Sequence, residues 1–519
     1  MNDGRGFRET RWLRVYWAYV ALLLIVLLCV QIGSIRQEAQ TVDEAVYLAS
    51  GVTYWTTGDY RMNPEHPPLE KLVSALPLLP LHLEVRTATP LWAHVIGPGL
   101  DEYYYAQDFL YNNRAPWQEI LFLGRLPTIV ASALFAFTLA LWTLRRAGRW
   151  ASVIALTLFA FDPTLIAHGR YATNDLWVSF FFFLACIAWD AALVRTRSIP
   201  YFVVAGLALG CALGTKASAL SLPLVFVGLM IVRRSPWKSC LRGMTVSSLI
   251  ALGVLLVLYR GSLGAFASGV FFQYNQFVAG SGNLYYLFGE KSLVGWWYYY
   301  PIAFLIKTPL GTIVLALLTL GILIRAKRIR RELAVLVLPI VVFGAFALFS
   351  HVDIGVRYLL PIEAPLFALI GIVGATFTPR IPLVACLLAI AVESLAAFPN
   401  YLPFVNIAFG GADRAPRYLL DSNVDWGQDT LKLKSWLDAR DIKSICFAYF
   451  GAEPKAALGF AYVDVPPNPA TSASPITCVI AASAQFLYLH EELAWLRPLK
   501  PVAKVGESIY VYDLRPPAK

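Results

Sequence analysis

Long apolar runs recur along the chain, separated by short basic clusters or by longer polar loops. Most runs hold about 17 or more residues, enough to cross a hydrocarbon core roughly 30 Å thick. This pattern predicts about eleven membrane helices. They fall near residues 15–33, 121–144, 151–167, 176–194, 201–214, 218–232, 243–260, 300–324, 333–349, 362–377 and 381–398.

The fifth and sixth predicted spans are the least regular, because Lys216 interrupts a single apolar stretch. Both halves are short for a full crossing, so a tilted pair and a re-entrant pair remain alternatives. Gly206, Gly210 and Gly214 share one helix face at four-residue spacing, which favours close helix packing.

Composition agrees with this pattern and excludes an ordinary soluble globule. Of 519 residues, 58% are hydrophobic and 15% charged, whereas soluble domains carry about 25% charged residues. The first span follows four arginines and lacks a small-x-small cleavage motif, so we interpret it as an uncleaved signal anchor. The sequence therefore predicts a multi-pass protein of the inner (plasma) membrane.

The net charge of +10 orients the chain and does not indicate a nucleic-acid partner. The basic residues cluster between apolar runs, and by the positive-inside rule each cluster marks a cytoplasmic end. With an odd number of spans, the amino terminus is cytoplasmic and the carboxyl-terminal region extracytoplasmic. The clusters are Arg5/Arg8/Arg11/Arg14, Arg145/Arg146/Arg149, Arg195/Arg197, Arg233/Arg234/Lys238/Arg242 and Arg325/Lys327/Arg328/Arg330/Arg331.

Three long segments fall outside the membrane in this topology. Residues 35–120 form an acidic first loop whose apolar stretch Leu69–Leu81 is predicted to lie as helices in the interface. Residues 261–299 run into the aromatic cluster 296–300, typical of an interfacial belt. Residues 401–519 are predicted to form a small α/β domain, with a helix at Leu431–Arg440 and strands at Ser444–Phe450, Ile476–Ala482 and Ser508–Leu514.

Two further patterns lie in this domain. Cys446 and Cys478 fall in predicted strands outside the membrane, where oxidation is allowed, and the sequence leaves open whether they pair. Asp421, Asp425 and Asp429 recur at four-residue spacing. The glycine and glutamate of a calcium loop are absent from the sequence, so we interpret them as a helix cap.

Charged side chains gather on the predicted outer side. Asp43 and Glu44 follow the first span, Asp175 lies at the outer end of the third and fourth spans, and Lys307 and Arg357 lie near the outer face. Each cation alone is explained by snorkelling to the interface. A charge near the membrane centre costs about 2.5–3.5 kcal/mol or more, so the set together predicts a cavity where these groups meet.

Carboxylates beside fixed cations suit group transfer from a phosphate. One carboxylate takes the proton of an acceptor hydroxyl, and Arg or Lys stabilises a departing phosphate. An enzyme acting outside the cell has no nucleotide sugar available, so its donor must be carried by a lipid. Polyprenyl-phosphate sugar fits, and a single carboxylate base implies inversion at the anomeric carbon.

These motifs resemble a known family. The pair Asp43-Glu44, the run His66-Pro67-Pro68-Leu69, Arg170 with Asp175, and the run Arg357-Tyr358-Leu359-Leu360-Pro361 are similar to the protein O-mannosyltransferases. These belong to the membrane glycosyltransferases with the C-type (GT-C) fold, which also include bacterial lipid A aminoarabinose transferases. The resemblance covers about residues 10–400.

The resemblance implies roles for individual residues. It makes Asp43 the general base and Glu44 its neighbour in substrate binding or base positioning. Arg170, Asp175, Lys307, Arg357 and Tyr358 are expected to bind donor phosphate or acceptor, and Glu65 and His66 substrate. A divalent metal at Glu65 and His66 is an alternative, because some aminoarabinose transferases hold one at a carboxylate and a histidine.

The sequence thus predicts a polytopic α-helical GT-C domain at 1–400 and an extracytoplasmic α/β domain at 401–519. The expected function is transfer of a monosaccharide from a polyprenyl-phosphate carrier to a glycan, lipid or protein acceptor. Residues 261–299 are too few for the β-trefoil of eukaryotic family members, so a protein acceptor is not implied. A lipid-linked-sugar flippase or transporter and an oligosaccharide ligase are the alternatives. The long acidic external loop favours the enzyme.

Overall fold

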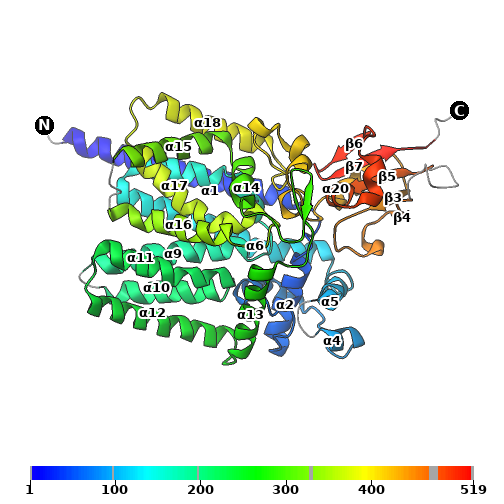
Figure 1. The fold of residues 1–519 in the computed structure, drawn as a ribbon, viewed down its shortest axis with the longest axis horizontal. Helices are drawn as coiled ribbons and strands as arrows, with labels where there is room; N and C mark the ends of the chain where they lie inside the picture. Colours follow the sequence, from blue (N-terminus) through cyan, green and yellow to red (C-terminus); the bar gives the residue numbers. More distant parts are fainter. Residues whose placement is uncertain (1–2, 96–98, 196–197, 327–330, 467–476, 516–519) are drawn as a thin grey trace.

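The computed structural model describes residues 3–95, 99–195, 198–326, 331–466 and 477–515. An elongated helical bundle carries a small sheet domain at one end, and the amino-terminal end of α1 (Asp3–Ile35) lies at the other end (Figure 1). Of the residues used above, Arg197, Lys327, Arg328, Arg330 and Ile476 lie outside the described ranges.

A helix, in some cases broken or accompanied by a short turn, occurs at each predicted span. Six described helices are long and apolar enough to cross a membrane, or seven if one bent pair counts as a span, and four are shorter. The chain is therefore a multi-pass membrane protein, while the count of eleven spans stays a prediction. The helices are α1, α6 (Trp117–Ala147), α7 (Arg149–Ala160) with α8 (Pro163–His168), α9 (Asp175–Val194), α10 (Ile199–Leu213), α11 (Leu222–Arg233), α12 (Trp237–Leu258), α14 (Tyr299–Lys307) with α15 (Leu310–Arg325), α16 (Ala334–Leu348), α17 (Leu360–Gly374) and α18 (Ile381–Ala396).

Two predicted spans contain breaks in the backbone. The span predicted at 300–324 is not one straight helix, because α14 and α15 meet at 120°. Thr308 precedes Pro309 and is extended (ψ 135°), as expected where a proline ring excludes the preceding residue from helical angles. Between α10 and α11, Lys216 is also extended (φ −154°, ψ 139°) and precedes the 3-10 turn Ala217–Ser221. Both breaks place a lysine at a helix end.

The glycine face of α10 allows α12 to approach closely. A Cβ atom on Gly206 would lie 2.8 Å from the Ser247 Cα, and one on Gly210 would lie 2.9 Å from the Ala251 Cα. Ser247 Oγ donates a hydrogen bond to the Phe202 carbonyl at 2.8 Å across the same contact. The glycine spacing therefore predicted close helix packing correctly, and the structure identifies α12 as the partner.

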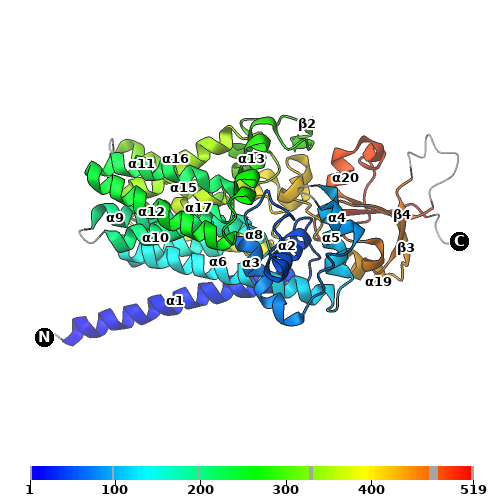
Figure 2. The same cartoon turned by 90° about the horizontal axis from the view of Figure 1, so that it is seen from below.

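The external loops form their own helices at the end of the bundle that carries the sheet domain (Figures 1 and 2). The interfacial helix predicted at Leu69–Leu81 is present as α3 and a following 3-10 helix. The elements are α2 (Glu44–Thr57), α3 (Leu69–Ala75) with the 3-10 helix Leu76–Leu81, α4 (Pro90–His94), α5 (Leu100–Tyr111), α13 (Gly264–Ala279) and the hairpin of β1 (Tyr285–Leu287) and β2 (Glu290–Ser292).

The carboxyl-terminal domain is built on a mixed sheet with strand order β4-β3-β5-β7-β6. Strand β3 is parallel to both β4 and β5, and the β5–β7 and β6–β7 pairs are antiparallel. Cys446 and Cys478 form a disulfide with their Cα atoms 6.0 Å apart. The elements are α19 (Thr430–Asp438), β3 (Ser444–Ala448), β4 (Ala461–Asp464), β5 (Val479–Ser483), α20 (Ala484–Leu489), β6 (Ala503–Val505) and β7 (Ile509–Asp513).

The α10–α12 contact generates a stability prediction. Gly210→Leu should destabilise the protein by about 1–3 kcal/mol, because the new side chain has no room against α12. The matched control is Gly253→Leu on α12, where a Cβ atom meets nothing within 4 Å. Thermal unfolding of the purified protein in detergent should show a lower Tm for the first variant only. Equal Tm values for both variants would contradict the packing argument.

Candidate active site

Four charged side chains from four separate segments meet at the end of the bundle that carries the sheet domain. Asp43, the residue before α2, has its Oδ2 atom 3.4 Å from Arg357 Nη1. The same nitrogen lies 3.4 Å from Asp175 Oδ2 at the start of α9. Lys216 Nζ, in the break between α10 and α11, lies 2.5 Å from Asp175 Oδ1. The result is a chain of alternating charges, which we call the charge chain.

Within the charge chain, Asp43 is the most accessible group. Its side chain is 23% exposed, compared with 8% for Arg357 and 2% for Asp175. Burial raises the pKa of the Asp43 carboxyl, and the nearby positive charge of Arg357 partly opposes that rise. A carboxylate with a raised pKa holds a proton more readily, which suits a general base.

Aromatic rings cover both cations of the charge chain. The Arg357 guanidinium lies 4.1 Å from the centre of the Trp426 ring, and Lys216 Nζ lies 4.0 Å from the centre of the Tyr358 ring. Arg357 Nε is buried without a hydrogen-bond partner in the described part of the chain. Because buried donors in proteins are nearly always paired, this nitrogen is available for an anionic ligand.

Glu44 does not share the exposure of its neighbour Asp43. Its carboxylate is fully buried and takes two hydrogen bonds from Arg125 at 2.7 and 2.6 Å. The backbone N–H groups of Thr41 and Ala172 donate to the same carboxylate at 2.9 and 3.0 Å. Glu44 therefore fixes the start of α2, and with it Asp43, against α6 and the segment before α9. This placement corresponds to base positioning and leaves no room for substrate contact.

Arg170 and Lys307 have partners of their own outside the charge chain. Arg170 is fully buried and donates to Glu38 Oε1 at 2.8 Å, and its Nε and Nη1 atoms are buried without hydrogen-bond partners in the described chain. Lys307 Nζ donates to the backbone carbonyls of Leu402 and Asn423, each at 2.6 Å. Within the described residues no ion pair joins Lys307 to Asp43, and two of its three ammonium N–H groups tie α14 to the chain beyond α18.

Glu65 and His66 belong to a second buried cluster, built around Lys71 of α3. Lys71 Nζ donates to the backbone carbonyls of Asn63 and His66 at 2.6 and 2.7 Å, and the Asn63 side chain donates to Glu65. Burial lowers the pKa of Lys71 to about 8 and raises that of Glu65. The His66 ring centre lies 5.7 Å from that of Tyr47, which follows Asp43 on α2.

This cluster does not fit the divalent metal considered for Glu65 and His66. Among the described residues, no three His, Cys, Asp or Glu side chains gather as metal ligands. The positive charge at this place is the ammonium of Lys71, which carbonyl oxygens already surround. Glu65 Oε2 and His66 Nδ1 are buried without partners in the described chain, so both remain open to a substrate contact.

The sequence reasoning missed residues that complete the site. Lys216 carried a signal, since it is a charge inside an apolar stretch, but it was interpreted only as an interruption. Trp426 and Asp421 lie in the segment Asp421–Asp429, which joins the bundle to the sheet domain. Asp421 has positive φ (56°), and burial raises its pKa to about 6.

The other two aspartates of this segment hold the domains together. Asp425 Oδ2 accepts a hydrogen bond from the Gln485 N–H at 2.9 Å, and Asp429 Oδ2 accepts one from Ser508 Oγ at 2.7 Å. Asp429 is the N-cap residue of α19, where the prediction places a cap, but its side chain makes no capping hydrogen bond.

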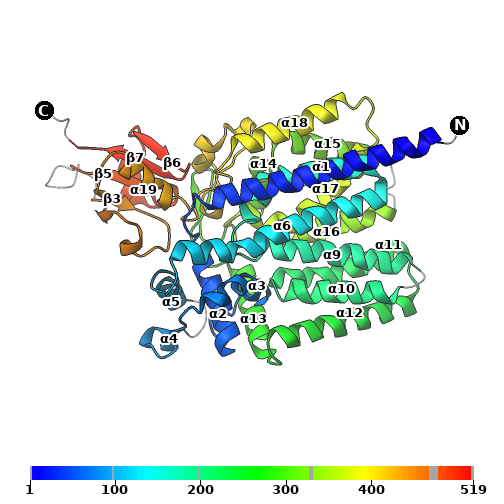
Figure 3. The same cartoon turned by 180° about the vertical axis from the view of Figure 1, so that it is seen from behind.

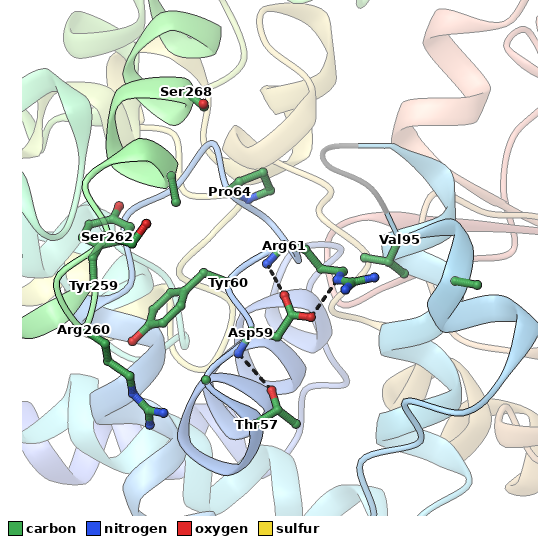
Figure 4. A pocket seen from close by; sticks show the side chains of 13 residues that line it. Thr57, Asp59, Tyr60, Arg61, Pro64, Val95, Tyr259, Arg260, Ser262 and Ser268 are labelled. Carbon is green, nitrogen blue, oxygen red and sulfur yellow. Dashed lines mark hydrogen bonds and ion pairs between the residues drawn. The ribbon is translucent and has the colours of Figure 1, made fainter.

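One large cavity is separate from the charge chain. It has a volume of about 980 Å³ and lies where the loop after α2 meets α4 and the junction of α12 with α13 (Figure 4). Asp59 and Arg61 form an ion pair at 2.7 Å in its wall. Asp43 precedes α2 and this cavity follows it; the helix has 14 residues and so spans about 21 Å. The cavity is therefore not the place where Asp43 acts.

A membrane helix bundle with a carboxylate–arginine site at one end agrees with the expected class, the membrane glycosyltransferases. Residues 19–265 match the sequence profile of the family described as dolichyl-phosphate-mannose-protein mannosyltransferase. This match confirms the predicted resemblance and identifies the chain as a glycosyltransferase similar to that family. It includes Asp43, Asp175 and Lys216 but ends before Arg357. No curated protein matches the sequence.

Solved structures resemble the chain at low sequence identity. ArnT from Cupriavidus metallidurans bound to undecaprenyl phosphate is 14% identical, with a TM-score of 0.50 over 96% of this chain and 99% of that chain. The archaeal oligosaccharyltransferase AglB from Archaeoglobus fulgidus is 10% identical, with a TM-score of 0.48 over 75% of this chain and 56% of that chain. The likeness to ArnT shows that the chain has the GT-C fold.

Buried carboxyl groups near the site generate a prediction about pH. Glu70 on α3 is fully buried, and burial raises its pKa to about 7 from the ordinary 4.5. The folded protein therefore favours the protonated form, and this contribution to stability is lost as the pH rises from about 4.5 through about 7. Glu70→Gln should flatten that part of the Tm-against-pH curve between pH 5 and 8.

The control for this measurement is Glu119→Gln, which changes an exposed carboxylate on α6. Its Tm should follow the wild-type curve across the whole range. If Glu70→Gln also follows the wild-type curve, Glu70 is ionised in the folded protein and the argument from burial is wrong.

Proposed function

We propose that this protein transfers a monosaccharide from a polyprenyl-phosphate carrier to an acceptor on the extracytoplasmic side of the inner membrane, with inversion and with Asp43 as general base. The observation that carries the proposal is the contact between Asp43 and Arg357. It joins a partly exposed carboxylate to a guanidinium whose Nε has no partner in the described chain. The proposed base and the proposed phosphate-binding group are thus in direct contact.

The proton of the acceptor hydroxyl is the first thing that must move. Asp43 accepts it while the hydroxyl oxygen attacks the anomeric carbon of the donor sugar. A positioned base of this kind contributes about 10²–10⁴-fold to the rate. The ion pair of Glu44 with Arg125 holds α2 in place, so that the carboxylate of Asp43 stays fixed beside Arg357.

The leaving group is the lipid phosphate. As the new bond forms, the bond between the anomeric carbon and the phosphate oxygen breaks, and both electrons stay with the phosphate. Arg357 donates from Nε to the developing charge. Lys216 is a second positive charge at the site, and it shares the partner Asp175 with Arg357. Fixed cations that need no rearrangement during the reaction are the most effective stabilisers of such charge.

The stereochemistry and the class of donor follow from this arrangement. A single base acting on the acceptor, with no covalent sugar intermediate, inverts the anomeric centre. The structure of ArnT that shares the fold contains undecaprenyl phosphate, which supports a lipid phosphate as carrier here. The basic clusters between the spans support a site on the outer side, because by the positive-inside rule they mark the cytoplasmic ends.

Removal of the base tests the proposal directly. Asp43→Asn should lower the release of polyprenyl phosphate from a polyprenyl-phosphate hexose by about 10²–10⁴-fold, because the amide cannot accept the proton. Donor binding should persist. Asp59→Asn, which changes a partly exposed carboxylate in the same loop, should release the lipid at the wild-type rate. Wild-type release by Asp43→Asn would remove Asp43 as the base.

The charge of Arg357 should set the pH at which the base works. Arg357 lowers the pKa of Asp43 against the effect of burial, so Arg357→Gln should raise that pKa. Because the base must be ionised, the acid limb of the pH–rate profile should move to higher pH, in addition to a lower maximum. The control is Arg61→Gln, an exposed arginine outside the charge chain. An acid limb that stays in place would show that another group limits the rate.

A further inference from the structure

The carboxyl-terminal domain contains a second concave site, which we call the aromatic pocket. It has a volume of about 370 Å³ and lies at the ends of β3 and β4, beside α20 and the turn that follows it. Phe447, Tyr449 and Tyr462 line it from the strands, and Phe486 and His490 line it from α20 and its end. None of these residues has a part in the proposed transfer reaction.

The topology of the sheet favours a ligand at this edge. Strands β4 and β5 are both parallel to β3 and lie on opposite sides of it. The connection from β4 to β5 therefore passes over β3. In open sheets with parallel strands, ligands bind outside the carboxyl ends of the strands where the strand order reverses. The pocket includes Ala448 and Asp464, the last residues of β3 and β4.

Two stacked ring pairs supply the walls. Phe447 stacks on Tyr449 with ring centres 5.0 Å apart and meets Tyr462 edge-on at 5.4 Å. Phe486 stacks on His490 with ring centres 4.5 Å apart. Tyr449, Tyr462 and Phe486 are only partly buried, so these rings are held by neighbours and still present surface to a ligand.

The polar groups of the pocket select the kind of ligand. Asp464 and Glu492 are exposed carboxylates that accept hydrogen bonds, and Lys455 Nζ lies 4.5 Å from the centre of the Tyr462 ring. Hydroxyl groups are suitable donors to the two carboxylates. Flat apolar ring faces beside such acceptors match a sugar, which has an apolar C–H face and a rim of hydroxyl groups.

The pocket is connected to the charge chain through one short segment. Tyr449 donates from its hydroxyl to Glu453, and that hydroxyl lies 3.4 Å from the Gly427 carbonyl. Gly427 follows Trp426, whose ring covers Arg357. Tyr449 thus joins a wall of the pocket to the segment that forms a wall of the transfer site.

We propose that the aromatic pocket is a saccharide-binding subsite and that it holds sugar residues of a glycan acceptor. The inference rests on the proposed function and deepens it by assigning the acceptor class. A ring in the pocket packs its apolar face on Tyr462 and Phe486, while its hydroxyl groups donate to Asp464 and Glu492. The end of the glycan is then free to reach Asp43.

The test measures saccharide binding to the full-length protein in lipid nanodiscs by saturation-transfer NMR. Chitotriose, mannotriose and cellotriose serve as probes. At least one of them should bind the wild type, and Tyr462→Ala and Phe486→Ala should each weaken that binding by roughly tenfold, because each removes a ring face. Tyr462→Phe keeps the ring and should retain binding. Tyr104→Ala, an exposed tyrosine on α5, is the matched control.

The outcomes separate this inference from the proposed reaction. Asp43→Asn should bind the trisaccharide like the wild type while losing lipid release, so a failure of the general-base proposal leaves the binding result unaffected. The inference is overturned if none of the three saccharides binds, or if binding survives in both alanine variants. Unchanged Tm values of the variants show that a loss of binding is not a loss of folding.

Discussion

The structure depends on pairing charges at a place where water is scarce. Asp175 is 2% exposed and lies between two cations, Arg357 and Lys216. Removing one partner of such a buried pair typically costs about 3–5 kcal/mol, because the other charge is left uncompensated. One set of contacts therefore fixes the positions of the segments that carry these residues. Asp43 joins that set at its edge, where it still meets solvent.

The breaks in the bundle serve the same requirement. A lysine in the middle of a continuous membrane helix would face lipid, but Lys216 and Lys307 each lie where a helix ends and the backbone turns extended. Lys216 then meets a carboxylate, and Lys307 meets two carbonyl oxygens. The irregular backbone is tolerated there because protein groups, and not lipid, satisfy its polar atoms.

Local sequence patterns predicted the local structure well. Apolar runs predicted the helical regions, and glycine spacing predicted close packing on α10. Motifs predicted Asp43 and Arg357 as site residues. No spacing of residues in the sequence indicated which side chains far apart along the chain would pair. Nothing near Glu44 indicated that Arg125 would bind it, and the hydropathy pattern that exposed Lys216 as an interruption gave no information on its partner. The partners of Lys307 were not indicated for the same reason, since its acceptors are backbone carbonyls, which every residue possesses.

The segment Asp421–Asp429 shows why the sheet domain and the bundle act as one unit. Asp425 and Asp429 bind groups of the sheet domain, while the ring of Trp426 between them lies on Arg357. Asn423 accepts from the Val356 N–H beside Arg357, and its carbonyl accepts from Lys307. A shift of the sheet domain would therefore move the wall of the transfer site. An acceptor bound on that domain would meet the base in a geometry fixed by the fold, and such fixed geometry is a large part of what an enzyme contributes to a reaction between two substrates.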